Sequence, residues 1–272
     1  NELTILVADT GVGKSIYAVQ IAHEISKTKK VLYFDLELSD KQFQKRYSEN
    51  YENNFQFNDN FYRVDFKRRF TMPENMSYES YFLDSLKKVL DETGAKIVII
   101  DNMTRLISSD TDKAATAKPL MDSLNDLKFD YNLTLLLLEH TKKVDNSRPI
   151  QLNDLQGSKM KSNFADAVFT IGRCFKDKNL RYVKKLKVRS GELLFDADNV
   201  ILYEISKISN FLKLKQIGYA NEFELLKQPS ENDKANIIQE VRNLSQQGKS
   251  LRQIADEVGI SKSSVERILK NN

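Results

Sequence analysis

The chain has 272 residues, which is long enough for one large domain and a small second one. Its 40% hydrophobic and 29% charged residues are typical of soluble proteins, and no apolar run approaches the roughly 20 residues of a membrane helix, so we expect no membrane partner. The single cysteine excludes an internal disulfide, no signal peptide pattern is present, and the net charge of +4 permits polyanionic partners without indicating them; we expect a cytoplasmic protein.

Short apolar runs alternate with helical patterns through the first 172 residues. The runs predict strands at 4–8, 31–37, 61–66, 96–101, 133–140 and 166–172, and the periodic segments predict helices at 16–26, 82–92 and 119–131. Uninterrupted apolar strands are typical of a parallel sheet covered by helices on both faces. The segment 48–60, rich in asparagine and aromatic residues, is interpreted as an irregular surface connection.

The pattern changes after Leu180. Segments 180–195, 200–205 and 211–218 alternate as strands without intervening helices, which predicts antiparallel strands at one edge of the sheet. Residues 228–233 resemble a linker and helix start, and everything after them is helical. We therefore expect an α/β domain over 1–228 and a small all-α domain over 229–272.

The segment ADTGVGKS lies between the first strand and the first helix, which is the context of a phosphate-binding P-loop. Backbone N–H groups and the positive helix end would hold a β-phosphate, Lys14 would neutralise the β and γ oxygens, and the Ser15 hydroxyl would ligate Mg²⁺. Ala8 occupies the usual first glycine position, which requires a negative φ there. The predicted nucleotide-binding residues are Thr10, Gly11, Val12, Gly13, Lys14, Ser15 and Ile16, and the cofactors are ATP and Mg²⁺.

Three further side chains follow strand ends. Asp101 closes the strand 96–101, where a carboxylate associated with Mg²⁺ belongs. Glu37 follows the second strand and would activate the attacking water; Asp35 is the competing carboxylate, but its earlier position favours a structural role. His140 could contact the phosphate or the water, or it could be a structural histidine that bonds backbone.

With these residues, the chain from Leu3 to about Leu226 resembles the RecA-like ATPase core shared by DnaB-type replicative helicases and the plasmid helicase RepA. LVADTGVGKSIYAVQIA resembles the RepA P-loop, which also tolerates alanine first, and VLYFDLELSDKQFQKR resembles the DnaB-type segment that bears the catalytic glutamate. IIDNMTRLI and LLLLEHTKK are similar to the family's Walker B and sensor strands. The resemblance implies ATP hydrolysis in a homo-oligomeric ring, expected to be a hexamer.

KLKVRSGE resembles the family's hairpin of lysine, any residue and arginine, whose cations enter the neighbouring subunit's nucleotide site. This implies that Lys187 is a sensor lysine and Arg189 an arginine finger, where a fixed guanidinium stabilises charge on the γ-phosphoryl group. Spacing alone leaves open a basic hairpin exposed to solvent.

Two segments would face DNA in such a ring. The first, 108–118, is polar and carries Lys113 and Lys118; the second, 141–163, carries five cations and few acids, so it could follow a phosphate backbone without reading sequence. A solvated basic loop is the alternative. The five cations are Lys142, Lys143, Arg148, Lys159 and Lys161.

The last forty residues resemble the helix-turn-helix of the resolvase class, with Gly259 at the turn and Ser261 capping the recognition helix. The expected core comprises Leu251, Ile254, Ala255, Val258, Ile260, Val265, Ile268 and Leu269. The expected DNA contacts are Lys262, Ser263, Ser264 and Arg267. A helical tail that binds protein is the alternative.

These features predict an ATP-dependent DNA motor of the RepA/DnaB-like class, acting in replication of a mobile element. An ATP-switched DNA-binding regulator without motor activity is the alternative. A metabolic P-loop kinase would leave the paired cations and the helical tail without a function.

Overall fold

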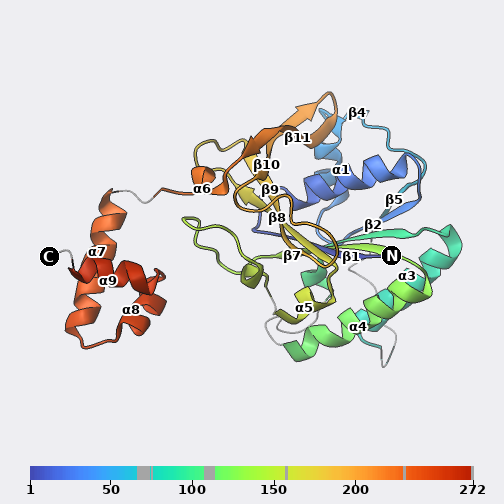
Figure 1. The fold of residues 1–272 in the computed structure, drawn as a ribbon. Coiled ribbons are helices and arrows are strands. Elements are labelled where there is room, and N and C mark those ends of the chain that lie inside the picture. Colours follow the sequence, from blue (N-terminus) through green and yellow to red (C-terminus); the bar gives the residue numbers. More distant parts are fainter. Residues whose placement is uncertain (66–73, 75, 107–113, 157–158, 229–230, 271–272) are drawn as a thin grey trace. The chain divides into compact units, whose positions relative to one another are not determined.

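The structure is a computed structural model that describes residues 1–65, 74, 76–106, 114–156, 159–228 and 231–270. It divides into two compact units, Asn1–Leu226 and Lys227–Asn272. The boundary expected after residue 228 differs from this division by two residues. Figure 1 shows the fold and labels most of its helices and strands.

Within the described residues, the first unit is built on a nine-stranded sheet in the order β11-β10-β9-β8-β1-β7-β6-β2-β5. The strands from β8 to β5 are parallel, and β9, β10 and β11 are antiparallel at one edge, as the change of pattern after Leu180 predicts. The sheet strands are β1 (Leu3–Ala8), β2 (Val31–Asp35), β5 (Phe61–Asp65), β6 (Ile97–Asp101), β7 (Thr134–His140), β8 (Ala167–Arg173), β9 (Leu180–Val188), β10 (Val200–Ile208) and β11 (Phe211–Ala220).

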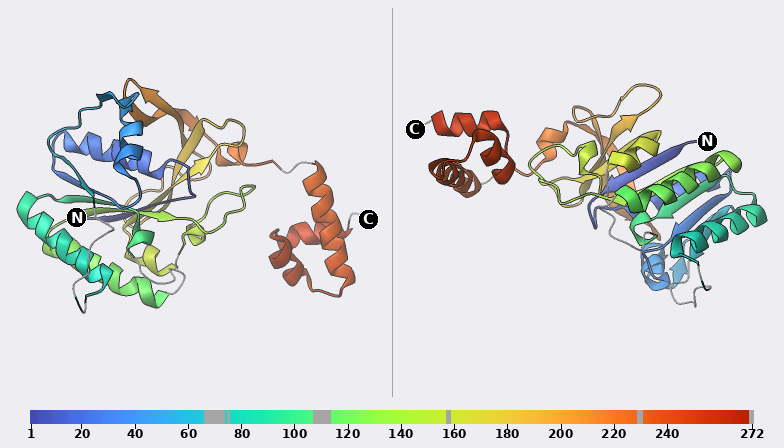
Figure 2. Two further views of the ribbon diagram at one scale, coloured as in Figure 1. Left: turned by 180° about the vertical axis from the view of Figure 1, so that it is seen from behind. Right: turned by 90° about the horizontal axis from the view of Figure 1, so that it is seen from below.

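Helices cover both faces of this sheet, as Figure 2 shows from behind and from below. Alternate residues of each strand point to opposite faces, so Ile5 and Val7 join the core under α3 (Tyr78–Thr93) and α4 (Ala114–Asp130). Leu6 and Ala8 join the second core with α1 (Lys14–Ser26). The short helices α2 (Asp40–Arg46) and α5 (Lys159–Phe164) follow β2 and precede β8.

The strand register brings the predicted site residues to one edge. Ala8 pairs with His140 across β1 and β7, and Asp35 pairs with Asp101 across β2 and β6. All four residues are at the carboxyl ends of parallel strands, where ligands bind in open α/β sheets. The sheet therefore brings together the phosphate loop, Asp101, Glu37 and His140.

Two parts of the first unit differ from the sequence prediction. Helix α4 begins at Ala114, five residues before the expected start, because alanine-rich residues extend the helical turn towards its amino end. Segment 48–60 is more ordered than a surface connection: it forms the short pair β3 (Ser48–Glu49) and β4 (Asn53–Asn54), and Phe55 and Phe57 pack against the second core.

The second unit consists of α7 (Glu231–Gln246), α8 (Leu251–Val258) and α9 (Lys262–Lys270). All the expected apolar residues belong to its core, together with Val241 and Leu244 of α7. Gly259 ends α8 in the left-handed region at φ 74°, and the Ser261 hydroxyl accepts a hydrogen bond from the Ser264 N–H at 3.1 Å. The predicted turn and cap are confirmed.

The described helices include none with the length and apolar character that crossing a lipid bilayer requires.

Candidate functional site

The P-loop is a tight turn between β1 and α1. Gly11 and Gly13 have φ values of 70° and 118°, in the left-handed region that favours glycine. Ala8 is the last residue of β1 and is not among the residues of positive φ, so alanine fits there as expected. Gly13 is the N-cap of α1, which begins at Lys14 and directs its positive end at the loop.

A cavity of 410 Å³ lies over this loop. Glycine-loop residues, Lys14, Glu37 and His140 line it, so the structure brings the predicted phosphate, water and sensor residues to one space. Its lining residues are Thr10, Gly11, Gly13, Lys14, Ser15, Ile16, Glu37, Leu38, Gln42, Arg46, Arg105, His140 and Ile205. Val12 is buried outside this lining.

Lys14 is 6% exposed and bends back over the loop. Its ammonium donates hydrogen bonds to the carbonyls of Ala8 at 2.8 Å and Asp9 at 3.1 Å, and lies 3.1 Å from His140 Nδ1. Burial lowers the pKa of Lys14, although the Asp101 and Glu37 carboxylates oppose this. A buried ammonium with only neutral direct partners favours binding of an anion.

Asp101 is fully buried beside Ser15 and Tyr33. Tyr33 donates to Asp101 Oδ2 at 2.6 Å, while Oδ1 is buried without a hydrogen-bond partner among the described residues. Burial raises the pKa of Asp101 to about 6. An unpartnered carboxylate oxygen beside a P-loop hydroxyl fits Mg²⁺, which Ser15 and Asp101 would hold, directly or through its water ligands, next to the phosphates.

Glu37 lines the same cavity. Asn102 Nδ2 donates to Glu37 Oε2 at 2.6 Å and lies 3.3 Å from His140 Nε2, so one amide lies against both predicted catalytic side chains. Burial and the Lys14 charge lower the pKa of His140, which favours a neutral imidazole. A carboxylate held by one hydrogen bond beside a phosphate cavity can orient and deprotonate water.

Asp35, the competing carboxylate, has other partners. Its Oδ1 accepts the N–H of Leu38 at 2.9 Å, and its Oδ2 accepts Arg63 Nε at 2.9 Å. Its side chain is not exposed. This pattern fits the structural role expected for it.

Lys187 and Arg189 lie at the other end of the strands, beside the amino ends of the parallel strands. Lys187 Nζ donates to the carbonyls of Ser162 and Ala165, and Arg189 pairs with Asp166 at 2.9 Å. Val188 aligns with Ala167, which aligns with Thr4, four residues before the P-loop end of β1, or about 13 Å along the strand. The two cations therefore do not reach the nucleotide cavity of their own chain.

The predicted DNA-facing cations of the first unit separate into groups. Lys142 and Lys143 are exposed, but Arg148 forms a two-pronged ion pair with Asp154. Lys161 is 1% exposed and pairs with buried Glu139 at 2.6 Å, so the expectation that it contacts DNA is wrong for this structure. The sequence around Lys161 gave no indication that Glu139 would pair with it in the interior.

The structure provides less support for DNA contacts by the other expected cations of the first unit. Lys118 lies in α4, paired with Asp122, rather than in a loop. Lys113 and the side chain of Lys159 lie outside the described residues. In the second unit, Lys262, Ser263 and Arg267 are exposed on α9, and Ser264 is half-buried.

Several polar residues around the site were not predicted from the sequence. Asn102 donates to Glu37 and lies against His140, and Arg46 lines the cavity with a buried Nη1 that has no hydrogen-bond partner among the described residues. Arg173 and Arg181 bond P-loop carbonyls from strands β8 and β9. Asn102 follows Asp101 directly, which was an available signal; the arginines reach the loop only through strand pairing.

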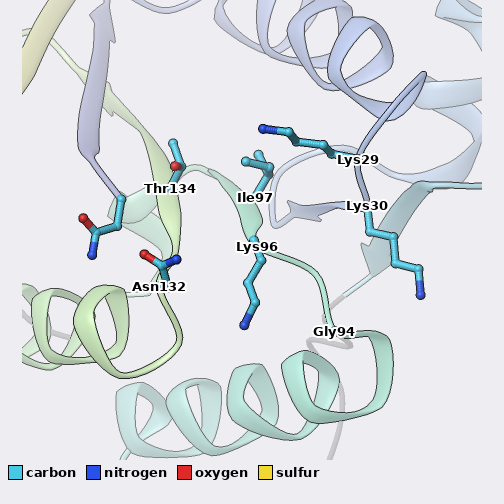
Figure 3. A pocket seen from close by; sticks show the side chains of 8 residues that line it. Lys29, Lys30, Gly94, Lys96, Ile97, Asn132 and Thr134 are labelled. Atoms are coloured by element: carbon cyan, nitrogen blue, oxygen red, sulfur yellow. The ribbon is translucent and has the colours of Figure 1, made fainter.

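A second cavity, of 420 Å³, opens at the amino ends of the parallel strands. Figure 3 shows Lys29, Lys30 and Lys96 around it. Lys30 donates to the carbonyl of Thr93 at the end of α3, and Lys96 donates to the carbonyl of Tyr131, just after α4. These lysines satisfy carbonyls at helix carboxyl ends, so the cavity has a structural explanation.

Comparisons with known proteins agree with this arrangement. Residues 228–272 match the helix-turn-helix domain of resolvase, and no curated protein matches the chain. A KaiC-like protein from the hyperthermophilic archaeon Pyrococcus horikoshii OT3 has a similar structure, with a TM-score of 0.52 and 16% identity over 78% of this chain and 88% of that one. That similarity shows the fold, which is RecA-like. Residues 1–146 match the AAA domain, and the chain therefore belongs to the AAA domain family of ATPases.

Proposed function

We propose that this protein is an ATP-dependent DNA motor of the RepA/DnaB-like class. Copies of the chain form a ring, expected to be a hexamer, and hydrolysis of ATP in the ring moves or unwinds DNA during replication of a mobile element. The observation that carries this proposal is the division of the catalytic groups: Glu37 and Lys14 lie at one sheet edge, and Lys187 and Arg189 lie at the other.

Hydrolysis is supported by the contacts at the carboxyl edge. The loop N–H groups and Lys14 bind and neutralise the phosphates, and Glu37 accepts a proton from the attacking water while Asn102 holds its second oxygen. His140 lies beside both Lys14 and Asn102 and so responds to the γ-phosphate. Mg²⁺, held at Ser15 and Asp101, would neutralise phosphate charge.

Assembly is supported by the position of Arg189. Its side chain is 53% exposed, and its guanidinium occupies a surface ion pair with Asp166 that is worth little in water. Exchange of this carboxylate for a triphosphate of another copy costs little, and a guanidinium stabilises the charge that develops on the γ-phosphoryl group. Hydrolysis would then depend on contact between copies.

Mixing of two inactive variants tests this proposal. Arg189→Ala should bind ATP and fail to hydrolyse it, and Lys14→Ala should fail to bind it. Mixed rings contain interfaces that join an intact P-loop to an intact Arg189, so the mixture should regain part of the wild-type ATPase rate. Absence of any rescue, with both variants still assembling, would count against shared sites.

An ATP-switched DNA-binding regulator is the second candidate function. The observation that favours it is the state of the predicted DNA loop, where Arg148 and Lys161 are engaged by Asp154 and Glu139. In this function nucleotide controls assembly, and the helix-turn-helix unit binds duplex DNA.

The ATPase rate with and without single-stranded DNA separates the two functions. A motor should be stimulated at least tenfold by single strands, because each step consumes ATP. A switch should show unchanged turnover with single strands and a change in duplex affinity between ADP and a non-hydrolysable ATP analogue.

A further inference from the structure

Two arginines hold the outer side of the P-loop. Arg181 Nε donates to the Val12 carbonyl at 2.8 Å, and Arg173 Nη2 donates to the Thr10 carbonyl at 2.6 Å. Arg173 ends β8, Arg181 is the second residue of β9, and the two are direct partners in the antiparallel register. Both guanidiniums thus reach the loop from one rigid strand pair.

The carbonyls that they hold decide where two N–H groups point. In a trans peptide, the C=O of one residue and the N–H of the next point in opposite directions. The Thr10 carbonyl shares its peptide with the Gly11 N–H, and the Val12 carbonyl shares its peptide with the Gly13 N–H. Gly11 and Gly13 line the cavity, so carbonyls fixed outwards direct these N–H groups inwards.

The environment of Arg181 indicates a purpose beyond packing. The residue is 8% exposed, and in the described part of the chain no carboxylate forms an ion pair with it. Its Nη1 donates to the carbonyls of Lys178 and Leu180, so its charge is balanced by backbone dipoles alone. A buried charge without a counter-ion is costly, and burial together with nearby Arg173 lowers the pKa of Arg181.

We propose that Arg181 and Arg173 are positioning residues that orient the Gly11 and Gly13 N–H groups towards phosphate oxygens and add positive potential behind them. They touch the loop from outside and need no contact with the nucleotide. This inference rests on the nucleotide binding in the proposed function, but it requires neither DNA translocation nor a ring.

The test measures binding of Mg²⁺–ADP and of inorganic pyrophosphate to the full chain by calorimetry. Arg181→Met keeps the apolar stem and removes the donors, so the affinity for both probes should fall about tenfold, the value of one charged hydrogen bond. Arg181→Lys keeps the charge and one donor and should recover part of the loss. Arg173→Met, at a half-exposed position, should weaken both probes in the same direction and tests the proposal if Arg181→Met does not fold.

Lys128→Met is the matched control, because Lys128 is also a buried cation, 4% exposed, paired with Asp166 at the far edge of the sheet. It should lower the melting temperature and leave pyrophosphate affinity unchanged. Folded Arg181→Met and Arg173→Met that bind pyrophosphate as tightly as the wild type would overturn the inference. A wild-type chain that binds neither probe would instead overturn nucleotide binding itself.

Discussion

The Lys14 ammonium lies 3.1 Å from His140 Nδ1, so the lysine predicted to bind phosphate and the predicted sensor are in direct contact. An ammonium can only donate, so Nδ1 accepts and the imidazole is neutral. In the proposed function, nucleotide binding would draw Lys14 towards phosphate oxygens and place negative charge near the ring. This exchange would make His140 a reporter of phosphate at the loop.

We therefore expect the pKa of His140 to rise when Mg²⁺–ADP binds. Burial and the Lys14 charge hold it below its ordinary value without nucleotide, and both the departure of Lys14 and the arrival of an anion favour the imidazolium. NMR titration of the ring measures this change. The chain has two histidines, and His23, packed against Phe55 and Phe57, is an internal control that should not move. An unchanged pKa of His140 would contradict the idea that contact with Lys14 lets His140 respond to bound phosphate.

Affinity for Mg²⁺ should fall as the pH drops below about 6. Burial raises the pKa of Asp101 to about 6, and a proton on this carboxyl group competes with the metal, so each further pH unit should weaken Mg²⁺ about tenfold. Calorimetric Mg²⁺ titration of the ADP complex between pH 5 and 7.5 measures this slope. Asp101→Asn should bind Mg²⁺ weakly at every pH; a wild type without the slope would contradict the assignment.

The same shift has the opposite sign for folding. Because the pKa of Asp101 is raised in the folded chain, its contribution to the free energy of unfolding is largest below its unfolded value near 4 and is lost as the pH rises through about 6.

Glu37→Gln and Asp35→Asn should have different effects. Glu37→Gln removes the base and should lower kcat at least 100-fold while nucleotide affinity and melting temperature stay near the wild type. Asp35→Asn weakens the ion pair with Arg63 and should lower the melting temperature. Steady-state ATPase rates and thermal melts compare the two. Full turnover by the Glu37→Gln protein would mean that another residue is the catalytic base.

Lys161→Ala should destabilise the first unit by about 3–5 kcal/mol, because it leaves Glu139 buried without its partner. Glu139→Gln together with Lys161→Met should recover much of this loss. Urea unfolding measures both changes, and Lys143→Ala, at an exposed position, is the control. If Lys161→Ala melts as the wild type and loses DNA affinity instead, Lys161 contacts DNA after all.

Arg267→Ala should weaken duplex binding by the full chain and reduce the salt dependence of log K by about one charge, because Arg267 is exposed on α9. Arg252→Ala, exposed on α8, provides the comparison and should have a smaller effect. Fluorescence anisotropy over a salt series measures the slopes. Equal slopes for both variants would favour the protein-binding alternative for this unit.

The parts of the site that sequence analysis predicted are local in the chain. The P-loop is contiguous, and Asp101 and His140 end apolar strands, so parallel pairing alone brings them to one edge. The capped turn of the second unit is equally local, from Gly259 to Ser264.

The missed parts depend on partners distant in the chain. Lys161 pairs with Glu139 across 22 positions, and Arg181 reaches Val12 across 169, so no nearby pattern distinguishes either cation from a solvated one. Phe55 and Phe57 are half-buried because β11 brings Phe211 against them. The sequence shows that these residues are charged or aromatic. Only the tertiary fold shows which partners surround them.

Strand β9 has a consequence for assembly. Arg181 near its start contacts the phosphate loop, Lys187 lies near its end, and Arg189 follows, so about 26 Å of continuous backbone separates Arg181 from Arg189. In the proposed ring, this strand would connect the nucleotide site of its own copy to the nucleotide site of the next copy. Strain produced by hydrolysis in one copy would then pass along β9 to the next copy. The stiffness of this one strand would set the order in which the copies hydrolyse ATP.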